Sequence, residues 1–503
     1  MEEMKPSQRK GHFLHIRFLN CAVLFLLTRT AFTQSVSLPE PPQVRAKNHD
    51  ISVSLHAVNE NGRDAFAFNG AAVAPTLRAS PGDTLKITYV NDLPPKSPES
   101  CAVNPCMDMT NLHFHGLTVS PNTPQDDVLG MLAKPGDVLH YSVNIPRDHV
   151  PGLFWYHTHP HGESHRQVMD GMSGAIVIEG IDRYVPEVRG MRERVIVVRG
   201  LSIENSADAS SLRQRVEIPS NSCGGEHEPP EEIMTVNGAI RPRIHIRPHE
   251  RQFWRIVNAS ADRYLDLQVD GEKFDIVAMD GMPVAYHNPK QPTLVADHFL
   301  VAPAGRLEAI VTGPPQGAHA AFRTLCVNTG PVGDPNPAMV LADLVPDADR
   351  GKSRVRTKAA GMVDRRPPVY SPISVEKLKQ TVPEFTVTFT EDKNGFYING
   401  AKFSHDAAPM TTARVGTYQH WKIVNATAEL HPFHIHQVHF LAYAENGTAL
   451  QNPMWLDTVN VPIGGSVDVI LDFTNPVIKG MSLFHCHLLN HEDKGMMAKI
   501  LLE

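Results

Sequence analysis

The sequence has no excess of basic residues. Its 503 residues include 47 Lys and Arg against 54 Asp and Glu, which gives a formal net charge of −7. Proteins that bind nucleic acid depend on a basic surface to contact the phosphate backbone. The charge balance therefore argues against a nucleic-acid-binding protein.

Long hydrophobic runs are also missing, apart from one apolar stretch over residues 18–27 that is too short to cross a bilayer. Residues 31–33 provide a small-residue cleavage site. A basic region precedes the stretch, with Lys5, Arg9, Lys10 and Arg17. This order is typical of a secretory signal peptide. We predict that residues 1–33 are a signal peptide and that the mature protein is periplasmic or secreted, without stable membrane insertion; a short membrane anchor is the alternative.

Cysteine is scarce, with six residues in the chain. Cys21 lies in the predicted signal, and Cys486 lies among histidines. The other four are Cys101, Cys106, Cys223 and Cys326. One or two disulfides are plausible in an oxidising compartment, but four cysteines allow three pairings and the sequence does not choose among them. Free buried thiols are the alternative.

Proline and glycine, in contrast, are abundant, with 41 and 34 residues, and favour a turn-rich, all-β fold. Three segments that alternate apolar and polar residues, as a half-buried strand does, end at Asn91, Asn258 and Asn425. These asparagines are 167 residues apart (258 − 91 and 425 − 258). An Asn-Gly turn signal precedes each strand, at residues 69–70, 237–238 and 399–400.

The equal spacing predicts one β-rich unit that occurs three times. Many short strands with turn signals in a unit of this size indicate a Greek-key β-sandwich. We place the three domains at residues 40–183, 184–350 and 381–503. Residues 351–380 are polar, basic and contain proline, and we interpret them as a linker.

Histidine is clustered: the chain has 27, and eight of them form four His-x-His pairs. The pairs are His113 with His115, His157 with His159, His434 with His436, and His485 with His487. On a strand, residues two apart point to the same face, about 7 Å from each other. Eight imidazoles exceed the needs of a single ion, so a cluster of several metal ions is predicted. Imidazole suits copper, zinc, iron or nickel.

The same alternation separates Cys486 from its neighbours, because it faces the side opposite His485 and His487. His431 has the opposite parity to His434, and His491 and Met496 follow downstream. Two His, one Cys and a weak Met are the ligands of a blue-copper electron-transfer site. Met497 is an alternative to Met496. Cys486 would thus bind a different metal ion from the adjacent histidines, while remaining linked to them through the backbone.

The three units differ in their ligands. The first has Thr158 where the third has Cys486, and Thr110 where the third has His431. The second has apolar or aromatic residues at the ligand positions, namely Tyr264, Leu267 and Val269. We therefore predict a cluster between domains 1 and 3, with domain 2 as a spacer that binds no copper.

With these motifs, the sequence resembles the three-domain multicopper oxidases, in particular the laccase-like bacterial copper oxidases, over nearly the whole mature chain. The segments around His113 and from His485 to Met497 carry the most specific similarity. The resemblance implies three consecutive cupredoxin-like domains and four copper ions. It implies a type 1 copper at His431, Cys486, His491 and Met496, a type 2 copper at His113 and His434, and two type 3 coppers, one at His115, His157 and His487 and one at His159, His436 and His485.

The resemblance also implies buried acids that deliver protons to the cluster. Asp126 and Glu492 match best, and Asp127 is an alternative to Asp126. Three histidines near the motifs are expected to lie beside the ligands or in solvent: His161, His165 and His439. Asp457 is a further candidate, as a residue that touches the substrate near the type 1 copper.

The activity that the resemblance implies is the one-electron oxidation of a small reducing substrate, repeated four times and coupled to reduction of O2 to two waters. Phenols and aromatic amines are the favoured substrates, and the protein is expected to be a monomer. The alternative is a metal-ion oxidase for Cu(I), Fe(II) or Mn(II). The segment between His439 and Trp455 is short and contains a single methionine, Met454. It therefore lacks the methionine-rich insert common in copper-tolerance relatives, which favours organic substrates. A copper-free scaffold is disfavoured because no ligand is missing, and a nitrite reductase is disfavoured by the three-domain length and by His487.

Overall fold

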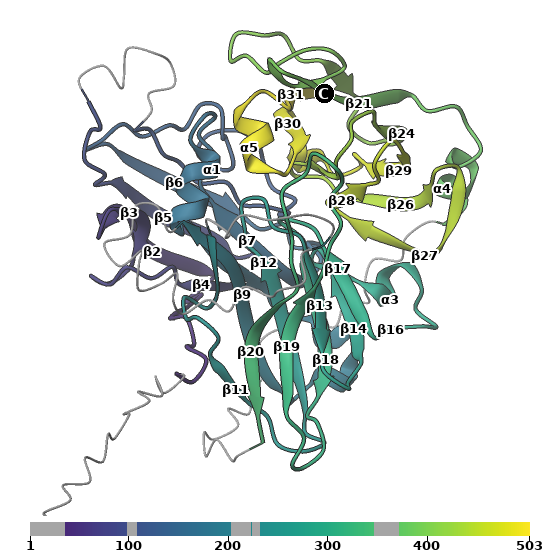
Figure 1. The fold of residues 1–503 in the computed structure, drawn as a ribbon. Helices are drawn as coiled ribbons and strands as arrows, with labels where there is room; N and C mark the ends of the chain where they lie inside the picture. The colour runs from purple at the N-terminus through teal and green to yellow at the C-terminus, as the bar shows by residue number, and fades with distance from the viewer. Residues whose placement is uncertain (1–35, 98–107, 203–222, 224–231, 347–371) are drawn as a thin grey trace, which may run out of the picture. The chain divides into compact units, whose positions relative to one another are not determined.

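The computed structural model describes residues 36–97, 108–202, 223, 232–346 and 372–503 (Figure 1). Its strands form six sheets, two in each of three successive regions of the chain. The predicted signal peptide and the residues Cys101 and Cys106 lie outside the described residues. Within the described ranges, no helix combines the length and apolar character needed to span a membrane.

The first region consists of two four-stranded sheets. One has the order β3 (Arg63–Ala67), β2 (Asp50–Glu60), β5 (Thr84–Asn91) and β6 (Val138–Asn144). The other has the order β1 (Gln43–Arg45), β4 (Thr76–Ala79), β8 (Ser173–Ile178) and β7 (Gly152–His157). Helix α1 (Ser164–Asp170) connects β7 to β8, and the short helices η1 (Ile181–Arg183) and η2 (Pro186–Val188) lead to the second region.

The second region has a seven-stranded and a five-stranded sheet. The larger sheet has the order β10 (Glu232–Val236), β9 (Arg192–Ser202), β12 (Arg251–Asn258), β18 (Arg306–Thr312), β14 (Phe274–Met279) and β15 (Met282–Pro283), with β16 (Leu294–Ala296) also on β14. The smaller has the order β11 (Arg243–His245), β20 (Met339–Val345), β19 (Ala320–Leu325), β13 (Leu265–Val269) and β17 (His298–Val301). Helix α3 (Val284–His287) follows β15.

The third region has a six-stranded and a five-stranded sheet. The first has the order β22 (Gly395–Ile398), β21 (Phe385–Asp392), β24 (Tyr418–Asn425), β29 (Ser466–Asp472), β26 (Phe440–Glu445) and β27 (Thr448–Leu456). The second has the order β23 (Thr411–Ala413), β31 (Met497–Leu502), β30 (Gly480–Cys486), β25 (His431–Ile435) and β28 (Thr458–Val461). Helix α5 (Leu489–Asp493) follows β30, and η3 (Pro476–Ile478) precedes it. Helix α4 (Pro372–Leu378) lies within the predicted linker.

The three strands that the sequence repeat identified occupy equivalent places. Strands β5, β12 and β24 each pair in parallel with the first long strand of their region, β2, β9 or β21. Each also pairs antiparallel with one later strand, β6, β18 or β29. Both residues of each predicted Asn-Gly turn have positive φ, as at Asn69 (51°) and Gly70 (78°), which suits a hairpin turn. The all-β prediction of three consecutive cupredoxin-like sandwiches is confirmed.

The asparagine that ends each repeated strand has the same structural role three times. The Asn425 side-chain amide donates to the carbonyl oxygens of Glu429 (2.7 Å) and Val461 (3.2 Å), and its Oδ1 accepts from the Thr427 N–H (3.0 Å). Asn91 and Asn258 are bonded in the same pattern. A fully buried amide that joins three segments of backbone explains why the residue recurs at this position.

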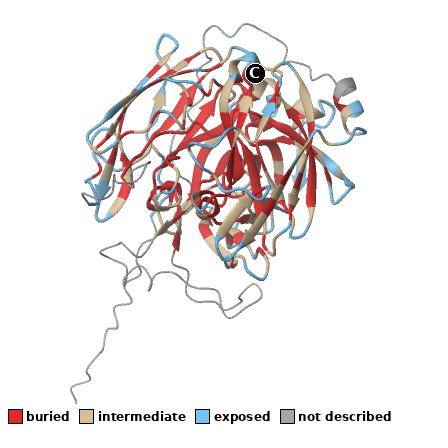
Figure 2. Ribbon diagram, turned by 90° about the horizontal axis from the view of Figure 1, so that it is seen from above, coloured by how far each residue is buried: buried red, intermediate tan, exposed pale blue. Residues whose placement is uncertain are grey.

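Figure 2 shows buried residues in the interior of the described structure and exposed residues towards its edges. All six residues of β7 and all six of β8 are buried, whereas β2 and β5 alternate between buried and more exposed positions. The reason is that residues of β7 and β8 pack against the second region, as Trp155 does in a cluster with Val257. The strand that carries His157 is thus covered on both faces.

Candidate metal centre

Two segments of the first region and two of the third carry the predicted ligands. β7 ends at His157, β25 begins at His431 and β30 ends at Cys486. His113 lies outside the strands, but its backbone exchanges two hydrogen bonds with that of His157, of 2.8 and 3.1 Å. The first His-x-His segment is therefore fixed beside β7.

The two regions meet through stacked imidazoles. The rings of His113 and His436 have centroids 3.8 Å apart, and those of His115 and His434 are 3.9 Å apart. In each pair one histidine comes from the first region and the other from the third. The structure thus brings together side chains that are more than 300 residues apart in sequence, as predicted.

The remaining contacts join the eight histidines into one buried group. His485 Nε2 lies 3.1 Å from His436 Nε2 and 3.3 Å from His159 Nε2. Ring centroids 5.1 to 5.8 Å apart connect a second set, His115, His157 and His487. None of the eight is more than 2% exposed. The set His159, His436 and His485 has nitrogens close enough for one ion to contact all three.

Several of these rings have one nitrogen bound by the protein and the other without a partner. His157 Nδ1 donates to the Thr158 carbonyl (2.9 Å), and His434 Nδ1 donates to the Asp457 carbonyl (2.8 Å). The Nε2 atoms of His157 and His434 are buried without a hydrogen-bond partner. Burial lowers the pKa of both rings, so they are neutral, the form that binds metal. A buried nitrogen without a partner is costly, and a metal ion removes that cost.

The second predicted site gathers around Cys486. His431 Nδ1 lies 3.3 Å from Cys486 Sγ and 3.3 Å from His491 Nδ1, so the three ligand atoms converge. The Cys486 side chain is fully buried, and burial raises the pKa of its thiol. A thiolate at this position therefore requires a cation beside it, such as the predicted copper ion would be.

Met496 and Met497 lie in different clusters. Met496 is fully buried in the same hydrophobic cluster as Cys486. Met497 pairs with His485 across the β30–β31 ladder and packs against Val128 and Leu483. The packing therefore favours Met496 on the cysteine side.

Three neighbours of the cysteine site were not identified from the sequence. The Phe396 ring stacks on the His491 ring at 3.8 Å. Thr427 Oγ1 lies 2.9 Å from His431 Nε2, and Glu429 Oε1 lies 3.4 Å from His491 Nε2. Thr427 and Glu429 precede His431 by four and two residues. This closeness in sequence was the one available indication that they lie near the cysteine site. These contacts orient the two imidazoles.

The positions predicted to lack ligands are occupied by other interactions. Thr110 Oγ1 donates to Gln167 Oε1 (2.9 Å) and lies 2.7 Å from the Tyr89 hydroxyl. In the second region, Tyr264 donates its hydroxyl hydrogen to Asn460 Oδ1 (2.9 Å), and Leu267 and Val269 belong to the hydrophobic core.

Asp126 lies directly behind a cluster histidine. Its Oδ1 is 3.0 Å from His113 Nδ1 and accepts from the Phe114 N–H (2.9 Å), while Oδ2 accepts from the Gln437 amide (2.6 Å). Burial raises the pKa of Asp126 to about 8, in the range suited to proton exchange near neutrality. Asp127 instead bonds to Thr123 and to the backbone of Gly130 in a surface turn. Between the two, the geometry favours Asp126.

Glu492 occupies the corresponding place on the opposite side. It is fully buried on α5, with Oε2 3.3 Å from His485 Nδ1 and Oε1 3.6 Å from His159 Nδ1. Burial raises the pKa of Glu492 well above its ordinary value. A carboxyl of this kind can hold a proton next to two cluster histidines.

The expectation that Asp457 touches substrate near the cysteine site is wrong. Asp457 is fully buried, and its Oδ1 lies 3.2 Å from His115 Nε2. Both of its oxygens accept from the Arg306 guanidinium, at 2.8 and 2.5 Å. Burial alone would raise the pKa of Asp457, but Arg306 outweighs it and holds the pKa below its ordinary value. Sequence proximity to Trp455 gave no information on which way this side chain points.

The second region therefore contributes two buried side chains to the site, Arg306 and Asp280. Arg306 begins β18, and its backbone N–H donates to Asp280 Oδ1 (2.9 Å). Asp280 Oδ2 also accepts from the Asp457 and Thr458 N–H groups, at 3.3 and 3.2 Å. A Cβ on Gly116 would lie 2.4 Å from Asp457 Oδ2. The glycine after His115 therefore leaves space for the ion pair between Arg306 and Asp457.

The three histidines expected beside the motifs contact other side chains or backbone. His439 Nε2 lies 3.0 Å from the Asp280 carbonyl oxygen and 3.6 Å from Asp457 Oδ2. His165 pairs with Asp262 at 2.8 Å; burial lowers the pKa of His165, but this carboxylate outweighs it and raises the pKa to about 9. His161 packs against Phe403, with ring centroids 4.7 Å apart.

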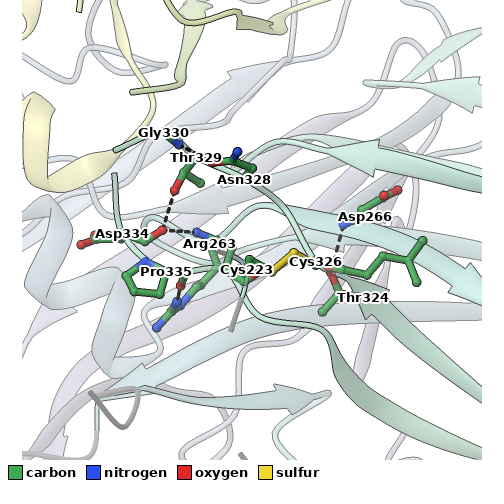
Figure 3. Close-up of a disulfide and its surroundings, with 12 residues drawn as sticks. Cys223, Arg263, Asp266, Thr324, Cys326, Asn328, Thr329, Gly330, Asp334 and Pro335 are labelled. Carbon is green, nitrogen blue, oxygen red and sulfur yellow. Dashed lines mark hydrogen bonds between the residues drawn. A yellow bond between two sulfur atoms is a disulfide. The ribbon is translucent and has the colours of Figure 1, made fainter. Parts of the chain in front are cut away.

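One disulfide lies within the described residues and joins Cys223 to Cys326, with Cα atoms 5.7 Å apart (Figure 3). It attaches residue 223 to the segment that follows β19. Arg263 is close by and donates to the Pro335 carbonyl. Among the described cysteines, Cys486 is free. The sequence left this pairing open.

Comparison with known protein families identifies the class. Three models of the multicopper oxidase family match the chain, over residues 51–182, 155–342 and 376–503. Together they span all three regions that the fold defines. The chain belongs to the multicopper oxidase family.

Named relatives come from several branches. The chain is similar to multicopper oxidase mco of Staphylococcus haemolyticus, at 24% identity over 88% of this chain and 84% of the relative. It is also similar to a laccase of Bacillus subtilis, at 26% identity over 86% of this chain and 89% of the relative. A solved multicopper oxidase of Campylobacter jejuni, described as a metallo-oxidase, has the same fold, with a TM-score of 0.69 at 22% identity over 93% of this chain and 95% of that one.

Proposed function

We propose that this protein is a laccase-like multicopper oxidase, which couples four one-electron oxidations of a phenol or aromatic amine to the reduction of O2 to two waters. One observation carries the proposal. Cys486, whose sulfur faces His431 at 3.3 Å, is joined by single peptide bonds to His485 and His487 in the buried histidine group. A continuous covalent route thus connects the two predicted centres.

The ligand sets are those that the resemblance to the multicopper oxidase family implies. Copper bound there supplies reversible one-electron chemistry and the binding and reduction of O2. We propose four ions: type 1 at His431, Cys486, His491 and Met496; type 2 at His113 and His434; and type 3 at His115, His157 and His487 and at His159, His436 and His485. The buried nitrogens without partners support this donor set.

Asp126 and Glu492 are proposed to hold and release the protons that the formation of water requires. Asp126 Oδ1 would exchange its proton beside His113 Nδ1, and Glu492 beside His485 and His159. Both carboxyls are shielded from bulk water, so a proton placed on them stays close to the reacting oxygen.

The remaining features of the proposal concern the chain as a whole. We propose export through the signal at residues 1–33, function as a monomer in the periplasm or outside the cell, and domain limits at 40–183, 184–350 and 381–503 with a linker at 351–380. Helix α4 would fix the C-terminal end of the linker to the folded protein, since Val375 packs with Met282 and Trp455.

A metal-ion oxidase, acting on Cu(I), Fe(II) or Mn(II), is the second candidate. It is favoured by Glu429, a buried carboxyl with Oε1 3.4 Å from His491 Nε2, on the side of that ring away from Cys486. Asp262 is also close, because its Oδ1 accepts from the Asn490 N–H next to His491 (3.3 Å). An ionised carboxylate suits a cationic electron donor better than a neutral phenol. Burial and the neighbouring Glu391 raise the pKa of Glu429 to about 9, so a bound cation would be what ionises this group near neutral pH. Two relatives bear on this point: the Campylobacter jejuni protein described as a metallo-oxidase and an iron transport multicopper oxidase of Gibberella zeae.

The test is steady-state oxygen uptake by the copper-loaded enzyme with a phenol, an aromatic diamine, Cu(I) and Fe(II) as alternative donors. The proposal predicts a higher kcat/KM for the organic donors. A Glu429→Gln variant separates the two candidates further, because the Gln amide oxygen can keep the contact with His491 Nε2 while the group can no longer ionise. Oxidation of metal ions should therefore weaken, and oxidation of a neutral phenol should stay nearly unchanged. Faster turnover of the metal ions, reduced in the variant, would favour the second candidate.

A further inference from the structure

Two histidines outside both proposed copper centres lie close together, one from the first region and one from the third. His161 follows β7, and His405 lies on the segment between β22 and β23. Their ring centroids are 6.4 Å apart. Phe403 contacts both, with centroids 4.7 Å from His161 and 5.3 Å from His405. One phenyl ring thus holds two imidazoles from distant parts of the chain.

Each of the two rings has a buried nitrogen with no hydrogen-bond partner, Nδ1 in His161 and Nε2 in His405. Both side chains are partly exposed, so water can reach the pair although it does not reach these two atoms. A buried imidazole nitrogen without a partner is destabilising unless something binds to it. Two such atoms on neighbouring rings, with ring planes at 62° to each other, suggest a shared ligand.

The separation of the rings matches one ion between them. Two imidazoles bound on opposite sides of an ion, with metal–nitrogen bonds of about 2 Å, have ring centres about 6 Å apart. The observed 6.4 Å is close to this distance. Two ligands in line are the preferred arrangement of a monovalent copper ion, and imidazole is a suitable ligand for copper.

The local charge also selects a monovalent ion. Lys499 Nζ lies 5.9 Å from the centre of the Phe403 ring and donates to the carbonyl oxygens of His405 and Ala407. Its charge repels a divalent ion twice as strongly as a monovalent one at the same distance. We propose that His161 and His405 form a binding site for one Cu(I) ion, separate from the cluster and from the cysteine site.

Silver provides the probe, because Ag(I) has the same charge and linear preference as Cu(I) and the enzyme cannot oxidise it. The copper-loaded enzyme is dialysed against Ag(I), and bound silver is counted by elemental analysis. Wild type should bind one more Ag(I) than either His161→Ala or His405→Ala, or bind it about tenfold or more tightly. The readout needs no turnover, so it stands or falls independently of the proposed oxidase activity.

Two further variants serve as controls. His319→Ala removes a histidine from an exposed turn and should leave silver binding at the wild-type level. Phe403→Leu keeps both imidazoles and should retain the site with lower affinity. Equal silver binding by wild type and both alanine variants would overturn the proposal. Tighter binding of Zn(II) than of Ag(I) at the pair would overturn its assignment to a monovalent ion.

Discussion

The repeated strands of the first and third regions pair in the same way, and each region contributes four imidazoles to the histidine cluster. Among the described residues, however, the cysteine site lies in the third region. In the third, His431 Nδ1 and Cys486 Sγ are 3.3 Å apart. In the first, Thr110 Oγ1 bonds to Gln167 Oε1 at 2.9 Å, and Gln167 comes from α1, the helix that follows the second His-x-His pair.

In the third region the equivalent helix, α5, carries His491. The same backbone frame therefore holds either a metal site or a neutral hydrogen-bonded network, depending on a few side chains. The shared cluster is unaffected by the difference, because the cluster histidines face the other side of the strands. The second region has none of the proposed ligands among its described residues, and it supplies Arg306 and Asp280 as supports.

The largest expected effect on activity comes from replacing the sulfur of Cys486 by a hydroxyl oxygen, which is what Thr158 has at the equivalent position of the first region. Cys486→Ser replaces the thiolate by a hydroxyl, which is a poor ligand for the proposed type 1 copper. The blue thiolate-to-copper absorption should disappear, and oxygen uptake should fall to background. Absorption spectra and metal analysis check the result, with about one copper lost and the others retained. A blue band that persists in this variant would contradict the assignment of Cys486.

Removal of the support from the second region should have the next largest effect. Arg306→Met leaves the buried Asp457 carboxylate without its partner, which should lower the free energy of unfolding by about 3–5 kcal/mol. Urea denaturation of the apo protein measures the change. Arg323→Met is the matched control, because Arg323 pairs with Asp270 where both side chains are about one-third exposed, and should cost about 1 kcal/mol or less. Equal losses in the two variants would mean that Arg306 has no special role.

The proposed proton-holding role predicts different effects for the adjacent acids Asp126 and Asp127. Asp126→Asn should lower kcat about 10²-fold at unchanged copper content, because the group beside His113 can no longer release a proton. Asp127→Asn, one residue along the chain, should leave kcat nearly unchanged, since Asp127 caps a surface turn. Oxygen uptake under saturating substrate measures both. A larger decrease in the Asp127 variant would reverse the choice between them.

The smallest expected effect is the most direct test of the comparison. Thr158→Cys places a cysteine in the first region at the position of Cys486, but Thr110 offers no imidazole there. Stability should change by about 1 kcal/mol or less, since Thr158 Oγ1 is buried without a partner. A Cys486→Ser, Thr158→Cys double variant should remain colourless. A blue absorption in that protein would show that the first region can build the site unaided.

The fold could be predicted from the sequence because the same local signals occur three times. Asn91, Asn258 and Asn425 end strands in the same position, and the Asn-Gly turns adopt the backbone that the residue pair favours. The convergence of the eight histidines was also predictable, since alternation along a strand fixes which side chains share a face.

What could not be predicted depends on contacts between regions. The Arg306–Asp457 pair joins β18 to the end of β27, and no periodic pattern places those segments together. Asp126 and Asp127 are chemically identical in sequence, and the hydrogen bonds from Phe114 and Gln437 are what distinguish them. The Cys223–Cys326 bond likewise depends on tertiary approach.

The stacked pairs His113–His436 and His115–His434 have a consequence for biosynthesis. Synthesis proceeds from the N-terminus, and the first region can fold while the third is still on the ribosome. The four imidazoles of the first region then form half of the histidine cluster, without their partners from the third region. A chain that stops before His485 would lack ligands of both proposed centres, so neither centre could form until the last residues of the third region are present.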